Sequence, residues 1–333
     1  YALPQSPQIY KQLLMVSGFD RYIQLARCFR DEDLRADRQP EFTQIDLEMS
    51  FVDVDDILEM TEGFISYLFK KVLNMDVSLP IKRLTYKEAM ERYGSDKPDT
   101  RFDMEIQDIS ELVENCGFGV FTSAIEAGGS VRAIVAKNSA KVLTRKEIDK
   151  LTEMVRGIGA KGLAFVRWVD EKPSCSFAKF LAEGELESIL AKIGCQQGDV
   201  ALIVADKNKI TLPVLGALRL QVAKQLDIIP ENQFNFLWIT EFPFFEWDDE
   251  SNTWLAMHHP FTMPMDDCIQ YLDSTPEKVI AKAFDLVLNG TELSSGSIRI
   301  TDYELQQKMF QSLGLTDEEI EAKFGFLVEA YKY

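Results

Sequence analysis

Apolar and polar residues alternate with a period of two in two runs between Arg21 and Phe51, with a long charged loop between them. Successive side chains of a β-strand point to opposite faces, so this pattern predicts a hairpin with one polar and one mostly apolar face. The polar face contains Gln24, Ala26, Cys28, Arg30, Gln44, Asp46 and Glu48. The pattern alone leaves two interpretations open: a pocket for a charged ligand, or a sheet with one wet face.

Helices are predicted on both sides of this hairpin. Before it, Ser6 can cap a helix, Pro7 suits the first helical position and Gly18 ends the helix. After it, Asp53 or Asp55 caps a second helix. The apolar stripe of the first helix is Ile9, Leu13 and Val16. The stripe of the second, which we expect to pack on the sheet, is Ile57, Met60, Phe64, Leu68 and Val72.

The character of the sequence changes at the loop-like stretch YGSDKPD, between Tyr93 and Asp99. Short apolar runs separated by glycines follow it, so we expect a domain boundary there. Short strands alternate with helices in this middle part, and one helix begins at a capping box formed by Thr144 and Glu147. From Phe236 onwards the sequence is again rich in predicted strands.

Isolated charges interrupt apolar strands around Asn289-Gly290, a dipeptide that strongly favours a hairpin turn. Asp285 precedes the turn, and Glu292 and Arg299 follow it. Charged groups in strands that are otherwise apolar need partners. From the residues alone, the two acids could equally be salt-bridge acceptors beside a turn.

Composition narrows the class of protein. With 333 residues, 46% of them hydrophobic, the chain can bury a substantial core and form two domains. The net charge of −18 argues against coating of nucleic acid by charge, so any RNA contact must be local. The five cysteines form no C-x-x-C pair, which favours a reducing cytoplasm over a disulfide framework or a zinc site. No apolar run approaches the length of a membrane span.

Short strings of residues point to one family. The string Phe29-Arg30-Asp31-Glu32, followed by Arg38-x-x-x-Phe42, resembles motif 2 of the class II aminoacyl-tRNA synthetases. Its longer form, CFRDEDLRADRQPEFTQID, resembles the bacterial-type aspartyl-tRNA synthetases, as do QSPQ-x-x-K near the start and the later HHPF. The resemblance implies an α+β fold, with a class II synthetase-like antiparallel sheet and flanking helices, interrupted by an inserted α/β GAD-like domain.

The resemblance also implies a division of the chain. Residues 1–100 would be the first part of the catalytic domain, 101–235 the inserted GAD-like domain and 236–333 the second part of the catalytic domain. The anticodon-binding domain, motif 1 and motif 3 of the family have no counterpart in the sequence. We therefore expect the chain to be the middle portion of a longer enzyme, and to be inactive by itself.

The function implied is that of an aspartate–tRNA ligase, which activates L-aspartate with ATP to aspartyl-adenylate and transfers it to the 3′ end of tRNA. The expected partners are tRNA-Asp, with tRNA-Asn left open, and a second copy of the full-length chain. A cytoplasmic location and no membrane contact are expected. Two alternatives remain: a tRNA-independent, adenylate-forming asparagine synthetase, and a non-catalytic tRNA-binding module on the same fold.

The resemblance assigns roles to particular residues. Arg30 and Glu32 would be catalytic, with Arg30 holding the α-phosphate and the reacting carboxylate. Asp285 and Glu292 would hold Mg²⁺, which prefers hard oxygen ligands. The expected aspartate-binding residues are Gln8, Lys11, Arg30, Gln44, Asp46, His258 and Arg299. The expected ATP-binding residues are Arg30, Asp31, Glu32, Gln39, Phe42 and Glu292.

Arg299 is the candidate for selecting aspartate over asparagine. A buried guanidinium pairs with a carboxylate through two hydrogen bonds that an amide cannot satisfy. Lys11 would assist this selection. Of the two adjacent histidines, His258 would contact aspartate and His259 would support it.

Overall fold

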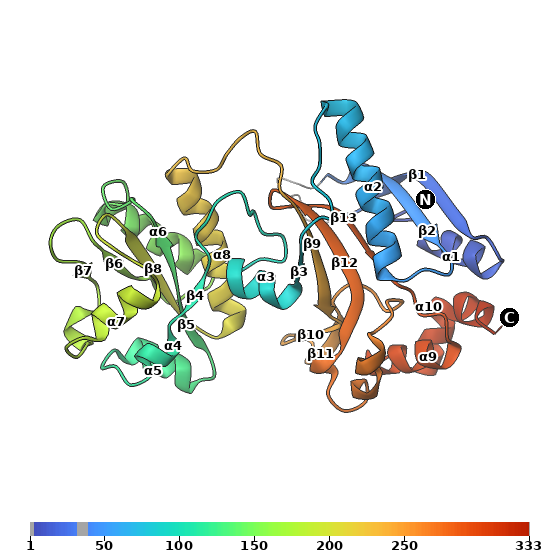
Figure 1. Cartoon of the computed structure of the whole chain (residues 1–333). Coiled ribbons are helices and arrows are strands. Elements are labelled where there is room, and N and C mark those ends of the chain that lie inside the picture. The colour runs from blue at the N-terminus through green and yellow to red at the C-terminus, as the bar shows by residue number, and fades with distance from the viewer. Residues whose placement is uncertain (1–2, 32–38, 333) are drawn as a thin grey trace. The chain divides into compact units, whose positions relative to one another are not determined.

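The structure is a computed structural model of the chain, and it describes residues 3–31 and 39–332 (Figure 1). The chain divides into two compact units, which are described separately below. The first unit comprises Tyr1–Arg83, Thr240–Asp285 and Ser294–Tyr333. The second comprises Leu84–Ile239 and Leu286–Leu293. The predicted α+β class with antiparallel sheets and flanking helices is confirmed.

The first unit begins with helix α1 (Gln8–Val16). Its first hydrogen bond runs from the Lys11 backbone N–H to the Pro7 carbonyl, at 3.1 Å, so Pro7 is the N-cap residue and no side chain caps the helix. The prediction that Ser6 caps this helix is therefore wrong. The helix begins one residue later than expected, because the N-cap is the residue whose carbonyl accepts the first helical bond.

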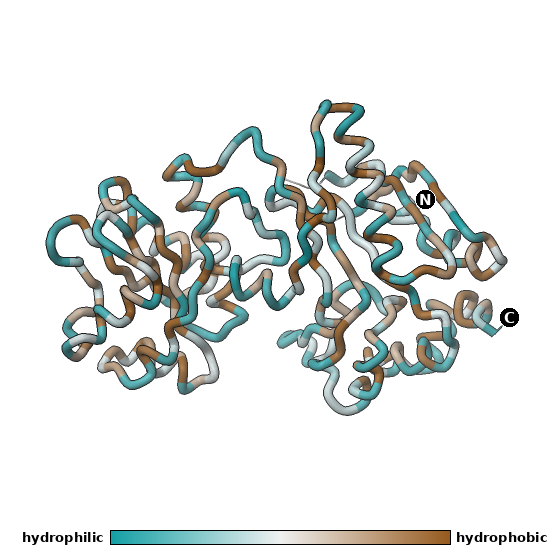
Figure 2. Tube along the Cα trace, viewed as in Figure 1, coloured by the Kyte–Doolittle hydropathy of each residue, from teal (hydrophilic) through white to brown (hydrophobic). Residues whose placement is uncertain are grey.

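The predicted hairpin is confirmed as strands β1 (Arg21–Phe29) and β2 (Glu41–Met49). They pair antiparallel, with Gln24 opposite Asp46 and Ala26 opposite Gln44, and Figure 2 shows polar and apolar residues alternating along both. The burial is the reverse of that in a sheet whose polar face contacts solvent. On the apolar face Ile23 is 69% exposed, whereas Ala26 on the polar face is 3% exposed. This burial argues against a polar face that is open to solvent, and a pocket for a charged ligand stays a prediction.

Helix α2 (Val54–Leu73) begins at Asp53, whose side chain forms a capping box with Asp56. One of the two predicted caps is thus confirmed. The predicted stripe is wrong, because Phe64 and Val72 are exposed. The buried residues are Leu58, Glu62 and Ile65. Their spacing of four and three residues defines one face of the helix. Apolar periodicity does not predict this face, because one of its three residues carries a carboxylate.

A four-stranded sheet has the order β13-β12-β9-β3. The predicted turn at Asn289-Gly290 joins β12 to β13, and both turn residues have positive φ (53° and 86°). The strands are β3 (Arg83–Thr85), β9 (Phe236–Pro243), β12 (Ile280–Leu288) and β13 (Thr291–Ser297). Further elements of the first unit are β10 (Phe245–Asp248), β11 (Thr253–Ala256), η2 (Asp266–Tyr271), η3 (Pro276–Lys278), α9 (Tyr303–Ser312) and α10 (Asp317–Ala330).

The second unit is built on a five-stranded sheet of order β4-β5-β8-β6-β7, in which neighbouring strands pair antiparallel. Its strands are β4 (Gln107–Asp108), β5 (Ser130–Ala136), β6 (Ala164–Arg167), β7 (Ser174–Cys175) and β8 (Val200–Asp206). Its helices are α3 (Tyr86–Tyr93), α4 (Ser110–Val113), α5 (Gly119–Glu126), α6 (Arg145–Gly157), η1 (Ala178–Phe180), α7 (Glu185–Lys192) and α8 (Asn208–Gln225).

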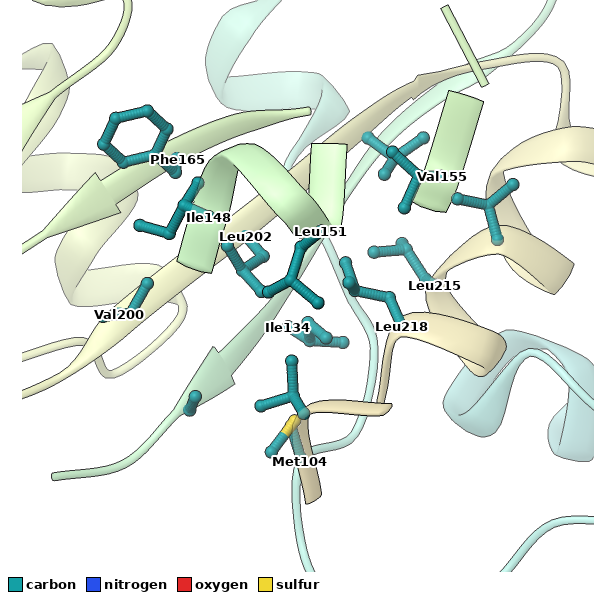
Figure 3. Packing of buried hydrophobic residues seen from close by; sticks show 14 of the residues in the cluster. Met104, Ile134, Ile148, Leu151, Val155, Phe165, Val200, Leu202, Leu215 and Leu218 are labelled. Atoms are coloured by element: carbon teal, nitrogen blue, oxygen red, sulfur yellow. The ribbon is translucent and has the colours of Figure 1, made fainter. Parts of the chain in front are cut away.

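Apolar side chains cover both faces of this sheet. Helices α6 and α8 pack on one face, where Ile148 and Leu218 meet Ile134 and Leu202 (Figure 3). Helices α4, α5 and α7 pack on the other face. Thr144 caps α6 as predicted, because its side chain accepts a hydrogen bond from the Glu147 backbone. The predicted capping box is only half formed, because the Glu147 side chain accepts from Lys150 at 2.7 Å. None of the helices in the described part of the chain is long and apolar enough to cross a membrane.

A buried arginine fixes a loop within the second unit. Arg219 on α8 is 1% exposed, and its guanidinium donates to the backbone carbonyls of Asp99 and Phe102, both at 2.8 Å, and of Met104, at 3.1 Å. The rings of Phe102 and Tyr93 lie 4.0 Å and 5.0 Å from its guanidinium carbon. Carbonyl acceptors and aromatic faces both stabilise a buried cation.

Candidate functional site

Polar side chains gather in the first unit, where α1 lies against the polar face of β2. Lys11 on α1 is 6% exposed, and its Nζ lies 2.7 Å from Asp46 Oδ1 and 3.1 Å from Glu48 Oε2. A buried ammonium group is stable only with such partners. The residues of this polar cluster are Gln8, Lys11, Asp46, Glu48, His259, Ser297 and Arg299.

Arg299 is the second cation of the polar cluster. Its Nη2 donates to Gln8 Oε1 at 2.9 Å, its Nη1 donates to Ser297 Oγ at 2.7 Å, and Nη1 also contacts the His259 ring. Burial lowers the pKa of the guanidinium, and the negative charge of Glu48 acts in the opposite direction. Arg299 and Lys11 thus place two positive charges in one largely buried region.

Two atoms of the polar cluster are buried and have no hydrogen-bond partner among the described residues: Asp46 Oδ2 and Arg299 Nε. Burial raises the pKa of the Tyr22 hydroxyl, and the charge of Asp46 and a hydrogen bond to the Asp46 side chain raise it further. The same hydroxyl also contacts Gln24. A buried polar atom without a partner costs about 1–3 kcal/mol. Asp46 Oδ2 is a hydrogen-bond acceptor and Arg299 Nε is a donor. A ligand with both an ammonium group and a carboxylate group would therefore satisfy them.

The two adjacent histidines have different surroundings. Burial, followed by the charges of Arg299, His258 and Lys11, lowers the pKa of His259 to about 3, so this imidazole is neutral at pH 7. Its Nδ1 accepts a hydrogen bond from the Phe261 backbone at 3.2 Å. His258 Nε2 lies 4.0 Å from Asp285 Oδ1. His259, predicted only as a supporting residue, is thus the histidine that contacts Arg299.

Four of the expected ATP-binding residues, Arg30, Asp31, Gln39 and Phe42, lie at the loop end of the hairpin. Arg30 follows β1, and its guanidinium carbon lies 5.1 Å from the ring centre of Phe42 on β2. Asp31 and Gln39 are exposed at the two sides of the loop. Gln44 Oε1 accepts a hydrogen bond from the Cys28 thiol at 3.3 Å. Glu32, the other predicted catalytic residue, lies outside the described residues.

The two predicted Mg²⁺ ligands belong to different units. Asp285, 4% exposed on β12, is in the first unit, and Glu292 on β13 is in the second. Glu292 Oε2 lies 2.7 Å from the Nζ of Lys97. No group of three or more His, Cys, Asp or Glu side chains in the described ranges could hold a metal ion. One or two carboxylates are nevertheless enough for a Mg²⁺ ion that is bound together with a nucleotide, because water and phosphate oxygens supply its other ligands.

Several polar residues of this region were not among the predicted site residues. Glu48 lies on the polar face of β2, and its alternation with Asp46 was a signal for it. Gln12 is 4% exposed and donates to the Tyr331 hydroxyl, which follows α10. Burial raises the pKa of that hydroxyl. No local pattern points to Ser297 or Tyr331, since each meets its partners only through the tertiary fold.

Relatives with curated names match the whole chain. An aspartate–tRNA ligase of Agathobacter rectalis is 58% identical over 335 residues, and an aspartate–tRNA(Asp/Asn) ligase of Lachnoclostridium phytofermentans is 55% identical over 334 residues. Each match covers 100% of this chain and 56% of the relative, so the chain spans about half the length of these relatives.

A solved structure and a family model also match. The aspartyl tRNA synthetase from Entamoeba histolytica aligns with a TM-score of 0.45 at 16% identity, covering 98% of this chain and 44% of that one. The family described as tRNA synthetases class II (D, K and N) matches residues 1–333. Its match, together with relatives at 55–58% identity, confirms the resemblance first seen in motif 2. The chain belongs to the class II tRNA synthetases of the D, K and N group.

Proposed function

We propose that this chain is the amino-acid-activating part of an aspartate–tRNA ligase. The observation that carries the proposal is the pair of buried, unpartnered atoms in the polar cluster, Asp46 Oδ2 and Arg299 Nε. L-Aspartate has the two groups that these atoms need. Its ammonium group would donate to Asp46, and its side-chain carboxylate would accept from Arg299. The names of the relatives agree with this choice of ligand.

Selection against asparagine follows from the charges of the same cluster. The side-chain carboxylate of aspartate would lie beside Arg299 and close to the positive charge of Lys11. Ser297 and Gln8 hold Arg299 in place, and Asp46 holds Lys11. Asparagine presents an amide whose N–H₂ group cannot accept from a guanidinium. A site built around a hydrogen-bonding group can reject an analogue that lacks it by roughly 10⁴-fold. His258, Gln8 and Gln44 would complete the aspartate-binding set.

Activation joins the α-carboxylate of aspartate to the α-phosphorus of ATP and releases pyrophosphate. Arg30 would neutralise the α-phosphate and align the attacking carboxylate, and Phe42 would stack on adenine. Asp31, Glu32 and Gln39 would border the nucleotide. Asp285 and Glu292 would hold Mg²⁺, which supplies charge neutralisation at the phosphates. Transfer to the tRNA 3′ end would follow at the same place.

The proposal extends to partners and organisation. The RNA substrate would be tRNA-Asp, and tRNA-Asn is a further candidate because one relative is named as a ligase for both. Residues 101–235 would form the inserted GAD-like domain between catalytic segments 1–100 and 236–333. The full-length protein would be a cytoplasmic homodimer. With a net charge of −18, contact with tRNA would depend on a few local cations.

Two assays on the full-length protein test the proposed function. Exchange of radioactive pyrophosphate into ATP should require L-aspartate and should not occur with L-asparagine. Purified tRNA-Asp should then be charged with aspartate. Absence of aspartate-dependent exchange would favour a non-catalytic tRNA-binding module. Exchange without tRNA charging would favour an asparagine synthetase that uses the same adenylate.

A further inference from the structure

An ion pair in the second unit involves a residue to which the proposed function gives no role. The Nζ of Lys97 lies 2.7 Å from Oε2 of Glu292, and the two side chains are 27% and 36% exposed. Glu292 is one of the two carboxylates proposed to hold Mg²⁺. The ammonium group of Lys97 therefore lies directly against an oxygen that the metal ion would need.

The loop that carries Lys97 is fixed by its own contacts. The Lys97 backbone N–H donates to Ser95 Oγ at 3.0 Å. Two residues later, Asp99 pairs with Arg101, whose Nη2 and Nε lie 2.7 Å and 3.0 Å from its carboxylate oxygens. Burial raises the pKa of Asp99, but the hydrogen bonds and charge of Arg101 outweigh this and hold it below its usual value. Arg219 holds the Asp99 carbonyl from the other side.

The hairpin turn that precedes Glu292 packs against this same loop. A Cβ atom added to Gly290, which has φ +86°, would lie 3.2 Å from the Asp99 Cβ. The Asn289 side chain accepts from the Asn235 backbone at 2.8 Å, and the Asn235 side chain donates to the Thr100 carbonyl at 2.9 Å. Both partners of the ion pair are thus positioned by their backbones, and their approach does not depend on flexible side chains alone.

We propose that Lys97 is a positioning residue that serves as the counter-cation of Glu292 and competes with the divalent metal ion for its carboxylate. This inference rests on the proposed role of Glu292 as a metal ligand. With no metal bound, Lys97 keeps the carboxylate oriented and offsets its charge. Metal binding requires that this ion pair be broken, so Lys97 lowers the affinity for the metal and sets the concentration at which the site fills.

The exposure of the pair determines the expected size of the effect. Half-exposed ion pairs are weak, with a median contribution of about 0–1 kcal/mol. Removal of the ammonium group should therefore tighten metal binding by about threefold, whereas removal of the Glu292 charge should weaken it by about tenfold or more. The two changes act in opposite directions, so they can be distinguished.

The test is a titration of the full-length protein with Mn²⁺, in which free Mn²⁺ is measured by electron paramagnetic resonance. Mn²⁺ is a suitable probe because it occupies the same oxygen sites as Mg²⁺. The variants are Lys97→Met, Lys97→Arg and Glu292→Gln. Lys87→Met is the matched control, because Lys87 forms another lysine–glutamate pair of the second unit, 4.0 Å from Glu91. Should Lys97→Met fail to fold, Lys97→Gln carries the same test.

We expect Lys97→Met to lower the Mn²⁺ dissociation constant about threefold, and Lys97→Arg and Lys87→Met to leave it near the wild-type value. Unchanged or weaker binding in Lys97→Met, together with weaker binding in Glu292→Gln, would overturn the role of Lys97 and leave the proposed function standing. Unchanged binding in Glu292→Gln would instead overturn the metal role of Glu292, and with it this inference.

Discussion

Replacement of Lys11 by methionine tests the polar cluster most severely. Lys11→Met removes one buried ammonium group and leaves two carboxylates, those of Asp46 and Glu48, without their cation. Both side chains are 13% exposed, so water can compensate only in part. Removal of one partner from a buried ion pair costs about 3–5 kcal/mol. We expect a loss of this size in the free energy of unfolding, measured by urea denaturation.

A matched control separates burial from simple loss of charge. Lys70 forms a pair of almost the same length with Asp76, 2.9 Å, in the same unit, but the two side chains are 51% and 85% exposed. Lys70→Met should therefore cost at most about 1 kcal/mol. Equal losses in the two variants would refute the reasoning. Addition of Glu48→Gln to Lys11→Met should recover part of the stability, because it removes one uncompensated charge.

Further predictions concern other buried groups. Arg219→Met should lower the free energy of unfolding by about 3 kcal/mol or more, because three buried carbonyls lose their donor. Arg156→Met, on the surface of α6, should lower it little. Equal melting temperatures of the two variants would contradict the prediction. His259 has a pKa of about 3 in the folded chain, against an ordinary value of 6.5. Between pH 6.5 and pH 3 the imidazole therefore binds a proton only in the unfolded chain, and the free energy of unfolding falls as the pH falls. From pH 7 to pH 5 the contribution of His259 to the free energy of unfolding should decrease by about 2 kcal/mol. The His259→Gln variant, compared with the wild type by urea denaturation at both pH values, should lose that part of the pH dependence. An unchanged pH dependence in the variant would contradict the assignment.

Local patterns were sufficient for much of the fold. The alternation between Arg21 and Phe51 gave the hairpin, and Asn289-Gly290 gave the turn, because both depend on neighbouring residues only. The capping residue Thr144 was found for the same reason. Motif strings then pointed to the family, which is now confirmed.

Patterns failed where a polar side chain is buried. Around the polar cluster the usual rule is reversed: Lys11 and Gln12 are buried on α1, whereas Ile9 and Val16 are exposed. Burial of Glu62 on α2 rotated the packed face away from the predicted stripe in the same way. Apolar periodicity assumes that apolar residues face the core, so it misplaces a helix wherever the interior is a site with charged residues.

Partners that meet only through the tertiary fold could not be predicted at all. The contact between Gln12 and Tyr331 joins residues at opposite ends of the sequence. The pair of Lys97 and Glu292 joins the YGSDKPD loop to a hairpin almost two hundred positions later. The sequence of this loop indicates only a domain boundary, because nothing local shows which carboxylate its lysine contacts.

Arg299 is the residue proposed to recognise the side-chain carboxylate of L-aspartate. The most direct test of this role is the dissociation constant of L-aspartate, measured by isothermal titration calorimetry on the full-length protein and on its Arg299→Leu variant, with Arg83→Leu as a surface control. We predict that Arg299→Leu weakens aspartate binding by about 10²-fold or more, because truncation of one partner of a buried charge pair costs about 2–5 kcal/mol, and that Arg83→Leu does not. Aspartate binding of wild-type strength in Arg299→Leu would contradict the account.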